Sequence, residues 1–370
     1  MTTPGRPLGR TGGDSYSLLE LPGVLTADQA AATVRAIAAI QRPDGAIPWF
    51  TGGHLDPWDH VESAMALDVA AEHERAEAAY RWLADNQNSD GSWYAAYTDG
   101  VPTDRVRESN FCAYIAVGLW HHYLATGDDA FLDRMWPTVY AAVEFVLGLQ
   151  APGGQIRWKR DPDGTAPDEA LLTGCSSMYQ ALRCALAIAE HREEPQPDWE
   201  LATGRLGHAV LDHPGRFLDK GRFSMDWYYP VLGTALRGAA AKERIEAEWD
   251  RFVVPGLGVR CVSDRPWVTG GESAELALAL WAMGESDRAV EILRWIGHLR
   301  AEDGMYWTGY VFEDDAVWPE EKTSWTAGSL LLAVAALGGD DATTAVFGGD
   351  LLPVGLEPSA SGCEADGCAS

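Results

Sequence analysis

The sequence lacks any run of about 18 consecutive apolar residues, the length that a helix needs to cross a membrane. Its N-terminal stretch, MTTPGRPLGRTGGDSYSLLELPGVL, contains neither the unbroken apolar core nor the small-residue cleavage pattern of a secretory signal. No leader or membrane anchor is therefore expected. These absences predict a cytoplasmic protein.

Basic residues are also scarce: 28 lysines and arginines stand against 55 acidic residues, which gives a formal net charge of −27. A field of this sign repels nucleic acid and anionic membrane surfaces, so we expect neither as a partner. A neutral oligosaccharide or polysaccharide suits such a protein better than an acidic polymer or a pyrophosphate ester. The composition leaves the oligomeric state open.

Cysteines are few, and none has the paired C-x-x-C spacing of a zinc site. They lie in apolar helical segments, in one loop and in a Gly/Ser/Ala-rich tail: Cys112, Cys175, Cys184, Cys261, Cys363 and Cys368. Without a secretory context we predict free thiols. Neither a cofactor nor a metal is expected, and the loose grouping of His54, Asp56 and Asp59 is the weak alternative for a metal site.

Tryptophan, by contrast, is abundant. The chain has 16 tryptophans, and many of them fall in predicted loops rather than on helix faces. Aromatic rings in a cleft stack on sugars and on other apolar ligand surfaces. The aromatic content thus favours a protein that binds a carbohydrate or an apolar ligand.

A repeat runs through most of the chain. Helices that end in Gln or Leu, followed by a turn and an aromatic residue, recur as IQRPDGAIPWF, NQNSDGSWYAA, LQAPGGQIRW and LRAEDGMYWTGY. A loop and a helix rich in small apolar residues follow each turn. The spacing is the same, 18 residues, from Asp44 to Glu62, from Asp90 to Glu108 and from Asp303 to Glu321. Such self-similarity predicts a repeat architecture.

The two helices of each repeat differ in character. The first is amphipathic, as in ERAEAAYRWLADNQ, so one face meets solvent, whereas the second is apolar nearly all round and must be buried. Six such pairs predict an all-α fold, a single-domain (α/α)6 barrel over residues 26–338 with a central ligand cavity. Residues 1–25 are predicted to form an N-terminal arm, and residues 339–370 a flexible tail.

Two groups of known proteins resemble these motifs. The turn Q-x-x-D-G-x-W and the segment WPEEKTSWTAGSLLLA resemble the six-hairpin glycosidases, and RESNFCAYIAVGLWHHYLATGDDAFLDRMWP is similar to the glucoamylase type. The same turn occurs in squalene cyclases and in protein prenyltransferase β-subunits. More narrowly, IQRPDGAIPWFTGGHLDPWDHVESAMAL resembles actinobacterial hydrolases of intracellular methylated mannose polysaccharides.

The resemblance implies a glycoside hydrolase that acts on a neutral α-linked mannan or methylated mannose polysaccharide, by inversion. The alternatives are a terpene cyclase or prenyltransferase-like enzyme and a non-catalytic carbohydrate-binding barrel. The sequence departs from both patterns. Leu171 occupies the position of a glucoamylase acid, and only the partial sequence Glu313, Asp314, Asp315 matches the Asp-x-Asp-Asp motif of a cyclase.

Glycoside hydrolysis needs one protonated and one ionised carboxyl group, about 6.5–9.5 Å apart in inverting enzymes. Glu272 heads the fifth predicted inner helix behind two glycines that would let a ligand approach, and a helix N-terminus favours the charged form of a general base. Asp44 lies beside Trp49 and Phe50, whose apolar surface favours the protonated form of a general acid. The structural alternatives are a helix-terminal residue for Glu272 and a capping Asp-Gly turn for Asp44.

Two further sets of candidates follow. Glu320 and Glu321 are the rival base, because a similar Pro-Glu motif serves that role in six-hairpin glucosidases. Other polar and aromatic residues of the loops and inner-helix starts are candidate substrate contacts, although about half of the aromatic ones would equally serve as core. They are Trp49, His54, Trp58, Asp59, Glu62, Glu108, Asn110, Trp227, Tyr228, Tyr229, Trp307 and Trp325.

Exhaustive chelation should leave hydrolysis largely intact, because two carboxyl groups suffice for the chemistry that the resemblance implies. The measurement is the rate of sugar release before and after dialysis against a chelator. Loss of activity that an added divalent cation restores would contradict the prediction, and would direct attention to His54, Asp56 and Asp59.

Overall fold

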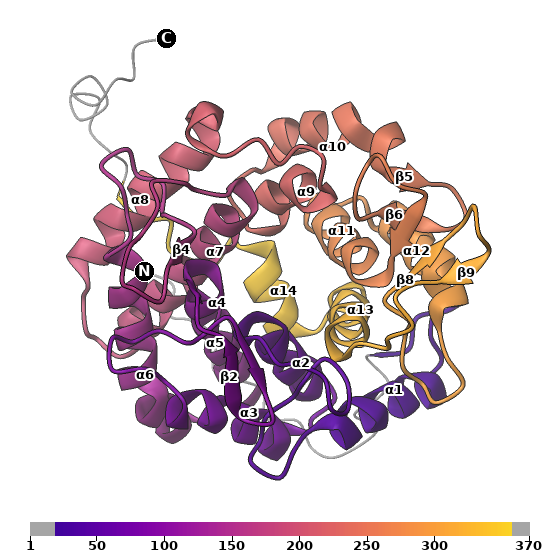
Figure 1. Ribbon diagram of the computed structural model, residues 1–370, viewed down its shortest axis with the longest axis horizontal. Helices are drawn as coiled ribbons and strands as arrows, with labels where there is room; N and C mark the ends of the chain where they lie inside the picture. Colours follow the sequence, from indigo (N-terminus) through magenta and orange to yellow (C-terminus); the bar gives the residue numbers. More distant parts are fainter. Residues whose placement is uncertain (1–18, 357–370) are drawn as a thin grey trace.

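Outer and inner helices alternate along the chain in a computed structural model that describes residues 19–356 (Figure 1). The outer layer consists of α1 (Ala27–Ile40), α3 (His73–Asp85), α6 (Asp129–Leu147), α8 (Pro197–Asp212), α10 (Gly238–Phe252) and α12 (Ser286–Trp295). The inner layer consists of α2 (Pro57–Val69), α4 (Ser109–Ala113) with α5 (Ile115–Thr126), α7 (Leu172–His191), α9 (Ser224–Leu232), α11 (Gly270–Ala282) and α13 (Ser324–Leu337).

Burial separates the two layers as the sequence predicts. Every residue of α2 except Asp59 is buried, and α13 is buried along most of its length. In the outer α10, by contrast, only Ala241, Ile245 and Phe252 are buried. The apolar helices therefore form the inner wall of the predicted (α/α)6 barrel, and the amphipathic ones cover it.

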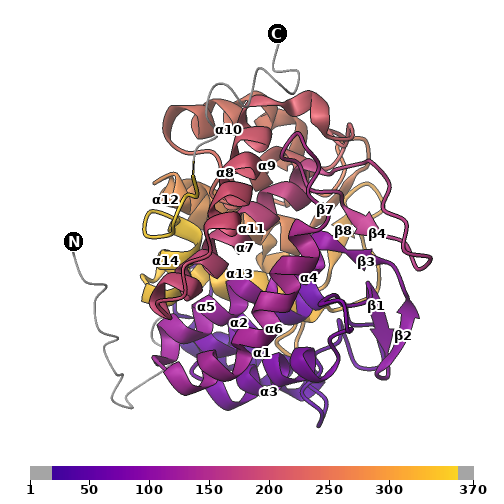
Figure 2. The same cartoon turned by 90° about the vertical axis from the view of Figure 1, so that its left-hand side faces the viewer.

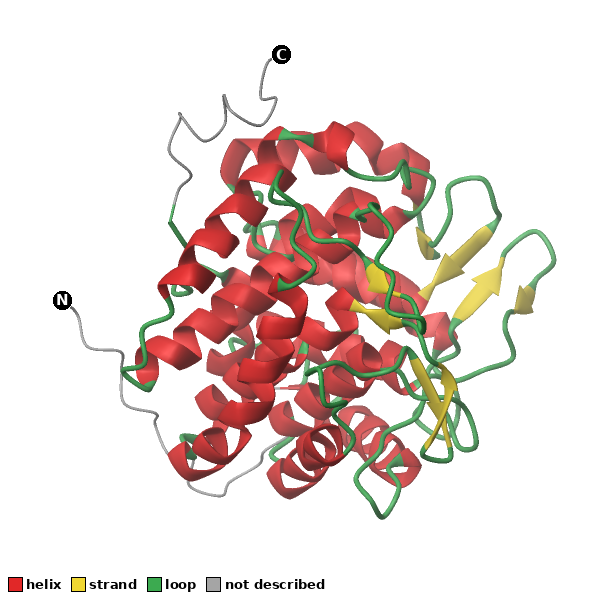
Figure 3. Cartoon of the chain, turned by 60° about the vertical axis from the view of Figure 1, so that its left-hand side comes forward, coloured by secondary structure: helices red, strands yellow, loops and turns green. Residues whose placement is uncertain are grey.

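Short strands gather at one end of the barrel, the end at which the inner helices begin, which we call the mouth (Figures 2 and 3). They form three small sheets. Two of these sheets are antiparallel pairs, β1 (Ala96–Thr98) with β2 (Val101–Asp104) and β3 (Arg107–Glu108) with β4 (Lys159–Arg160). The third is an antiparallel sheet in chain order: β5 (Val253–Val254), β6 (Gly258–Arg260), β7 (Trp267–Thr269), β8 (Gly309–Val311) and β9 (Ala316–Val317). The 3-10 turns η2 (Pro214–Arg216) and η3 (Ile296–Leu299) follow α8 and α12.

A glutamine after each of three outer helices ties its own turn to the next outer helix. The side-chain amide of Gln41 donates to the carbonyl of Gly45 in its turn, at 3.1 Å, and to the carbonyl of Arg75 on α3, at 2.8 Å. Gln87 and Gln150 repeat both bonds. The repeated Gln-x-x-x-Gly motif thus links one hairpin to the next.

The turn glycine contacts the same neighbour and closes the ring. Gly304, at φ +91°, lies so close to α1 that a Cβ atom would stand 2.8 Å from the carbonyl carbon of Ala32. The hydroxyl of Thr33 donates to the carbonyl of Gly304 at 2.7 Å. Because Gly304 follows the last outer helix and α1 is the first, this contact joins the two ends of the repeat. Equivalent glycines in the preceding turns contact the other outer helices: Gly45 contacts α3, Gly91 contacts α6 and Gly154 contacts α8.

Buried side chains of the inner helices hold the chain just after each turn. The thiol of Cys112 accepts from the backbone N–H of Trp93 at 3.3 Å, and that of Cys175 accepts from Ile156 at 3.4 Å. All four cysteines within the described residues are free thiols, as predicted. The predictions for Cys363 and Cys368 concern residues outside the described range.

The C-terminal segment corrects the predicted boundary at residue 338. Residues 341–348 form a helix, α14 (Asp341–Gly348), which contacts α5, α11 and α13 and lies at the end opposite the mouth (Figure 2). The buried guanidinium of Arg183 donates to the carbonyls of Gly349 and Leu352, both at 2.6 Å. The prediction of a flexible tail from residue 339 is therefore wrong up to residue 356, because buried contacts hold that segment on the barrel. Residues 357–370 lie outside the described range.

Among residues 19–356, no single helix is long and apolar enough to span a membrane. Only α13 and α14 taken together, across a bend of 98°, have the necessary length and composition.

Replacing Gly304 by alanine should destabilise the ring more than replacing Gly284, where an added methyl group would meet nothing within 4 Å. Both glycines have a positive φ, +91° and +80°, so both variants carry backbone strain of about 1–3 kcal/mol. Gly304→Ala adds overlap with α1, and we expect its free energy of unfolding in urea to fall by a further ~1–3 kcal/mol. Equal losses in the two variants would show that this contact is not needed for ring closure.

Candidate active site

Four carboxyl groups stand at matching positions on two inner helices. Helix α2 has Asp59 at its third residue and Glu62 at its sixth, and α11 has Glu272 and Glu275 at the same two positions. Three residues make almost one helical turn, so the members of a pair lie on one face, about 4.5 Å apart along the helix. We call Asp59 and Glu272 the upper layer, nearest the mouth, and Glu62 and Glu275 the lower layer.

Asp56 begins α2 and is held in place by two donors. It caps the helix, accepting from the backbone N–H of Asp59 at 2.9 Å, and its other oxygen accepts from the indole N–H of Trp49 at 2.7 Å. Burial raises the pKa of Asp56, whereas these two donors and the nearby His54 lower it in part. The two N–H donors favour the charged form of Asp56 over that of its neighbour.

Asp59 is the protonated member of the upper layer. Burial raises the pKa of Asp59 well above its usual range, and the charges of Asp56 and Glu62 raise it further. A side-chain hydrogen bond also joins Asp59 to Asp56. The donors around Asp56 stabilise the anion there, so the protonated form of the pair is favoured on Asp59 rather than on Asp56.

The lower layer is buried among tyrosines. The hydroxyls of Tyr228 and Tyr229 donate to the two oxygens of Glu275, the latter at 2.7 Å, and Tyr114 donates to Glu62 at 3.3 Å. Burial raises the pKa of Glu275 to about 8, although the tyrosine donors lower it. Burial and the charge of Glu275 raise the pKa of Glu62 well above its usual range. Glu275 is therefore mainly neutral at pH 7, and the protonated form of Glu62 is favoured in the same way.

Glu272 is buried, and its Oε2 atom has no hydrogen-bond partner within residues 19–356. The thiol of Cys261 lies within hydrogen-bonding reach of its carboxylate. The indole N–H of Trp325, at the start of the neighbouring α13, is likewise buried without a partner among the described residues. A buried acceptor and donor left open in a folded protein are costly. Their presence at one end of the barrel indicates a site that a polar ligand completes.

The two glycines before Glu272 have a different role from the predicted one. A Cβ atom on Gly271 would overlap the indole ring of Trp325, and one on Gly270 would stand 2.7 Å from the side chain of Thr326. These glycines let α11 and α13 approach each other. The expectation that they admit a ligand to the backbone is replaced by this packing role.

Aromatic side chains surround the upper layer. Trp58 lies 5.5 Å from the ring of Tyr114 and 5.5 Å from that of Tyr229, ring centroid to centroid. On the other side, the ring of Trp49 lies 4.2 Å from that of His54 and 6.4 Å from that of Trp325. The structure therefore brings together Trp49, His54, Trp58, Asp59, Glu62, Tyr228, Tyr229, Glu272 and Trp325 of the predicted set.

Glu108 and Asn110 lie at the start of α4, on the same end of the barrel. Burial and the charge of Asp56 raise the pKa of Glu108 to about 7. Asn110 is buried, with its side chain against Gly174. Glu108 therefore lies at the edge of the mouth, close enough to Asp56 for the two charges to interact.

Asp44 is not brought together with Glu272. It lies in the turn after α1, where its half-exposed carboxylate pairs with Arg42 at 3.2 Å and accepts from the backbone N–H of Ala46. This is the capping role that the Asp-Gly turn offered as an alternative. No described contact joins Asp44 to the acids of α2 and α11, so the pairing of Asp44 with Glu272 is not supported by the geometry.

Trp227 points away from the site, between the helix layers. Its ring stacks on Phe252 of α10 at a centroid distance of 5.3 Å, and its indole donates to the carbonyl of Arg244. The predicted sugar contact is thus core packing, because Tyr228 and Tyr229 occupy the inward positions of α9. Trp307 lies at the rim, where the ammonium of Lys322 stands 5.3 Å from its ring.

The rival bases also lie at the rim. The side chain of Glu320 is exposed, and Glu321 takes part through its backbone carbonyl, which accepts from the N–H and the hydroxyl of Thr308 at 3.0 Å. Neither side chain has a described contact with the two layers of acids.

Sequence reasoning missed Glu275 and gave Asp56 only a minor place. The signal for Glu275 was the matching spacing of acids in WDHVE and GGESAE, where two carboxyl residues three apart start a buried helix. A buried acid on an otherwise apolar helix requires a polar partner, and the Tyr-Tyr pair of α9 supplies two.

A separate cluster could hold a metal ion by its donor set, at the other end of α2. Asp68 accepts from His122 at 2.9 Å and from His73 at 3.0 Å, and the three side chains have ligand atoms within 4.8 Å of one another. Burial alone would raise the pKa of Asp68, but the two histidines outweigh it and lower that pKa. A buried hydrogen-bonded ion pair accounts for this geometry. His54, Asp56 and Asp59 form no such cluster among the described residues.

No family model matches the chain, whereas individual proteins do. The sequence is 55% identical over 337 residues to the MMP endo-(1,4)-3-O-methyl-alpha-D-mannosidase of Mycolicibacterium hassiacum, with 91% of this chain and 94% of that protein aligned. It is 24% identical over 168 residues to an uncharacterized glycosyl hydrolase of Methanocaldococcus jannaschii, which covers 44% of this chain and 26% of that protein.

Solved structures share the architecture at low identity. A wild-type glycosidase superposes with a TM-score of 0.69 at 15% identity, covering 89% of this chain and 99% of that chain. A D-mannose isomerase superposes with a TM-score of 0.67 at 11% identity, with the same coverage. These similarities confirm the predicted all-α barrel and concern the fold alone.

Removing one donor from the lower layer should raise the pKa of Glu275 above its value of about 8, because the Tyr229 hydroxyl stabilises the carboxylate. Infrared titration of the protonated-carboxyl band in Tyr229→Phe, assigned by its loss in Glu275→Gln, measures the shift. Tyr140→Phe, which alters a 40% exposed tyrosine on α6, is the control. A titration unchanged from the wild-type protein would contradict the assigned hydrogen bond.

Proposed function

The chain belongs to the family of the MMP endo-(1,4)-3-O-methyl-alpha-D-mannosidase and is a glycoside hydrolase, and we propose that it cleaves internal α-1,4 bonds of a 3-O-methylated mannose polysaccharide by inversion. The observation that carries this proposal is the contrast within the upper layer. Burial and the charge of Asp56 raise the pKa of Asp59, while the buried Glu272 leaves one oxygen without a partner among the described residues. A general acid needs a carboxyl group that favours its protonated form, and a general base needs an oxygen open to a water molecule.

Asp59 is the proposed general acid. Its carboxyl proton passes to the glycosidic oxygen as the bond to the anomeric carbon breaks, so the leaving sugar departs as a neutral alcohol. Asp59 is partly exposed, whereas every other residue of α2 is buried. Asp56 is the positioning residue, because its charge raises the pKa of Asp59.

Glu272 is the proposed general base. Its open oxygen would accept a proton from a water molecule as the water oxygen attacks the anomeric carbon. The Cys261 thiol fixes the carboxylate from one side without competing as a base, because burial and the charge of Glu272 raise the pKa of Cys261.

The spacing of the helices supports inversion. α2 and α11 are not neighbours in the inner layer: each packs against α13, which lies between them. Packed helices lie about 8–10 Å apart. Acids on two helices separated by a third therefore leave space for the water that an inverting enzyme places between carboxylate and sugar.

The other readings lack a supporting feature. Glu313, Asp314 and Asp315 lie in the exposed turn between β8 and β9, where Asp315 accepts from the Tyr310 hydroxyl. They do not form the buried acid of a cyclase. A protein that only binds carbohydrate would have no need of an acid whose pKa is raised by a second carboxylate.

Glu272→Gln and Asp59→Asn should each lower kcat by about 10²–10⁴-fold, the usual contribution of a general base or acid. The two variants separate on a mannoside with a good aryl leaving group, which needs no protonation to depart. Asp59→Asn should recover activity on it, whereas Glu272→Gln should not. Proton NMR of the first-formed product should show inverted anomeric configuration.

Glu320→Gln and Glu321→Gln serve as controls, and both should retain activity within a few-fold of the wild-type enzyme. A dead Glu321→Gln beside an active Glu272→Gln would move the base to the last hairpin. Retained anomeric configuration would refute inversion while leaving the hydrolase assignment intact.

A further inference from the structure

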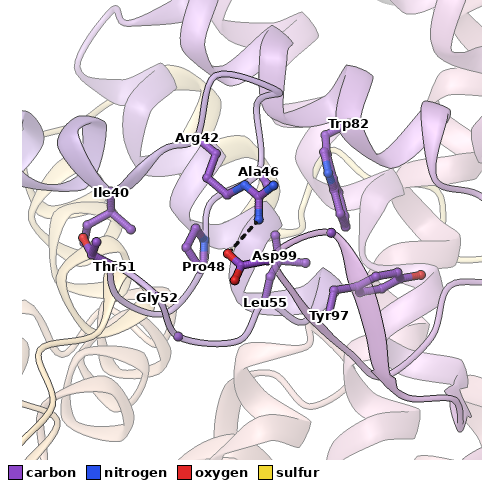
Figure 4. A pocket seen from close by; sticks show the side chains of 12 residues that line it. Ile40, Arg42, Ala46, Pro48, Thr51, Gly52, Leu55, Trp82, Tyr97 and Asp99 are labelled. Atoms are coloured by element: carbon purple, nitrogen blue, oxygen red, sulfur yellow. Dashed lines mark hydrogen bonds and ion pairs between the residues drawn. The ribbon is translucent and has the colours of Figure 1, made fainter.

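A cavity of about 320 Å³ lies beside the first hairpin, outside the two layers of acids (Figure 4). Its walls come from the end of α1, the loop before α2, the outer helix α3 and the β1–β2 turn. Most of the lining is apolar or aromatic: Ile40, Ala46, Pro48, Leu55, Trp82 and Tyr97. No residue of the upper or lower layer lines it.

One ion pair crosses the cavity opening. The guanidinium of Arg42 stands 3.4 Å from the carboxylate of Asp99, in the turn between β1 and β2 (Figure 4). The guanidinium of Arg42 also forms an ion pair with the carboxylate of Asp44, at 3.2 Å. The side chain of Asp99 is 84% exposed, so water screens the pair, which can exchange for hydrogen bonds to a ligand.

The cavity and the acid cluster share one loop. Thr51, Gly52 and Leu55 line the cavity, whereas Trp49 and Asp56, from the same stretch of chain, hold the upper layer through their 2.7 Å hydrogen bond. Two backbone hydrogen bonds between Leu55 and Tyr97, both 2.8 Å, fix this loop to the cavity wall. The cavity therefore adjoins the loop that holds the upper layer.

We propose that this cavity is a distal subsite that binds an outlying sugar residue of the polysaccharide, with its methyl ether against the apolar wall. The proposal rests on the proposed function, because an enzyme that cleaves internal bonds must hold sugars beyond the two that it separates. The two layers of acids could carry out hydrolysis without this cavity, so the two proposals can be tested separately.

The chemistry of the lining matches a methylated hexose. A methyl ether and the C–H face of a sugar ring gain free energy by leaving water, at about 25 cal/mol per Å² buried. The remaining hydroxyls need polar partners, which Arg42 supplies as a donor and Asp99 as an acceptor. An unmethylated sugar would leave part of the apolar wall unfilled.

The pair also gives Asp44 a role. Its carboxylate orients Arg42 at the opening, so Asp44 acts on the subsite through Arg42 and does not contact the sugar. Asp44 is accordingly a positioning residue for binding, in place of the acid that its aromatic surroundings suggested.

The test is a ladder of α-1,4-linked mannose oligosaccharides, with and without 3-O-methyl groups, from the shortest that is cleaved upward. Arg42→Met keeps the apolar stem and removes the donor, and Asp99→Asn suits the positive φ of +52° at that position. In the wild-type enzyme kcat/KM should rise when the methylated chain becomes long enough to reach the cavity. Both variants should lose about tenfold of that rise, through KM.

Arg288→Met is the matched control, since Arg288 forms an exposed ion pair with Glu246 elsewhere in the outer layer. It should follow the wild-type profile at every length. Binding of the same ladder to Glu272→Gln, with and without Arg42→Met, measures affinity by calorimetry without turnover, and the second change should weaken binding of the long methylated chains about tenfold.

The outcomes separate the two proposals. If the wild-type enzyme cleaves no member of the ladder, the proposed function fails. If it cleaves them, but Arg42→Met and Asp99→Asn match Arg288→Met at every length, the subsite is refuted while the function stands. If the wild-type enzyme gains equally from methylated and unmethylated chains, the methyl-binding role of the apolar wall is refuted.

Discussion

One repeated contact, that of a turn glycine with the main chain of the next outer helix, joins α1 to α3, α3 to α6, α6 to α8 and α12 to α1. Gln41, Gln87 and Gln150 fix that contact by bonding to the turn and to the neighbour at once. Each hairpin contacts the next one through a different surface from the one by which it is itself contacted. Such head-to-tail contacts build an open array unless the last hairpin meets the first. Gly304 closes it against α1. Ring closure then forces the inner helices to begin at one end, because every turn lies at that end.

Convergence of helix starts has an electrostatic consequence. The N-terminus of a helix favours negative charge, so carboxylates are tolerated there at a depth that would otherwise exclude them. Six such ends surround one axis in this fold. Two of these ends, those of α2 and α11, carry acids in two layers. Burial favours the neutral form of these acids, whereas the helix dipoles favour the charged form. In the lower layer burial has the larger effect, because Glu275 has a pKa of about 8 in spite of two tyrosine donors. Burial likewise raises the pKa of Asp59 and of Glu62, which reduces the repulsion among acids held this close together.

The sequence was sufficient for the architecture, because periodicity and the turn motif report local structure that the fold repeats. It also located the end of the barrel that carries the site, through Trp49, Trp58, Asp59 and Glu272. The sequence did not distinguish residues of one type that serve two different roles, a contact in the candidate site and a structural contact elsewhere. Asp44 and Asp59 both lie near tryptophans, and only the course of the loop shows that Asp44 pairs with Arg42. Trp227 and Tyr228 are adjacent in sequence yet lie on opposite faces of α9. Glu275 was missed because its partners come from another hairpin.

The proposed division of roles in the upper layer follows from what surrounds two equivalent positions. Asp59 and Glu272 are both the third residue of a helix, so the helix dipole acts on them alike and cannot make one an acid and the other a base. The difference comes from Asp56. Trp49 and a backbone N–H stabilise the charged form of Asp56, and this charge adds to burial in raising the pKa of Asp59. Glu272 has instead the thiol of Cys261 and a mainly neutral Glu275 as neighbours. In the proposed mechanism, the capping residue of α2 is therefore what distinguishes Asp59 from Glu272.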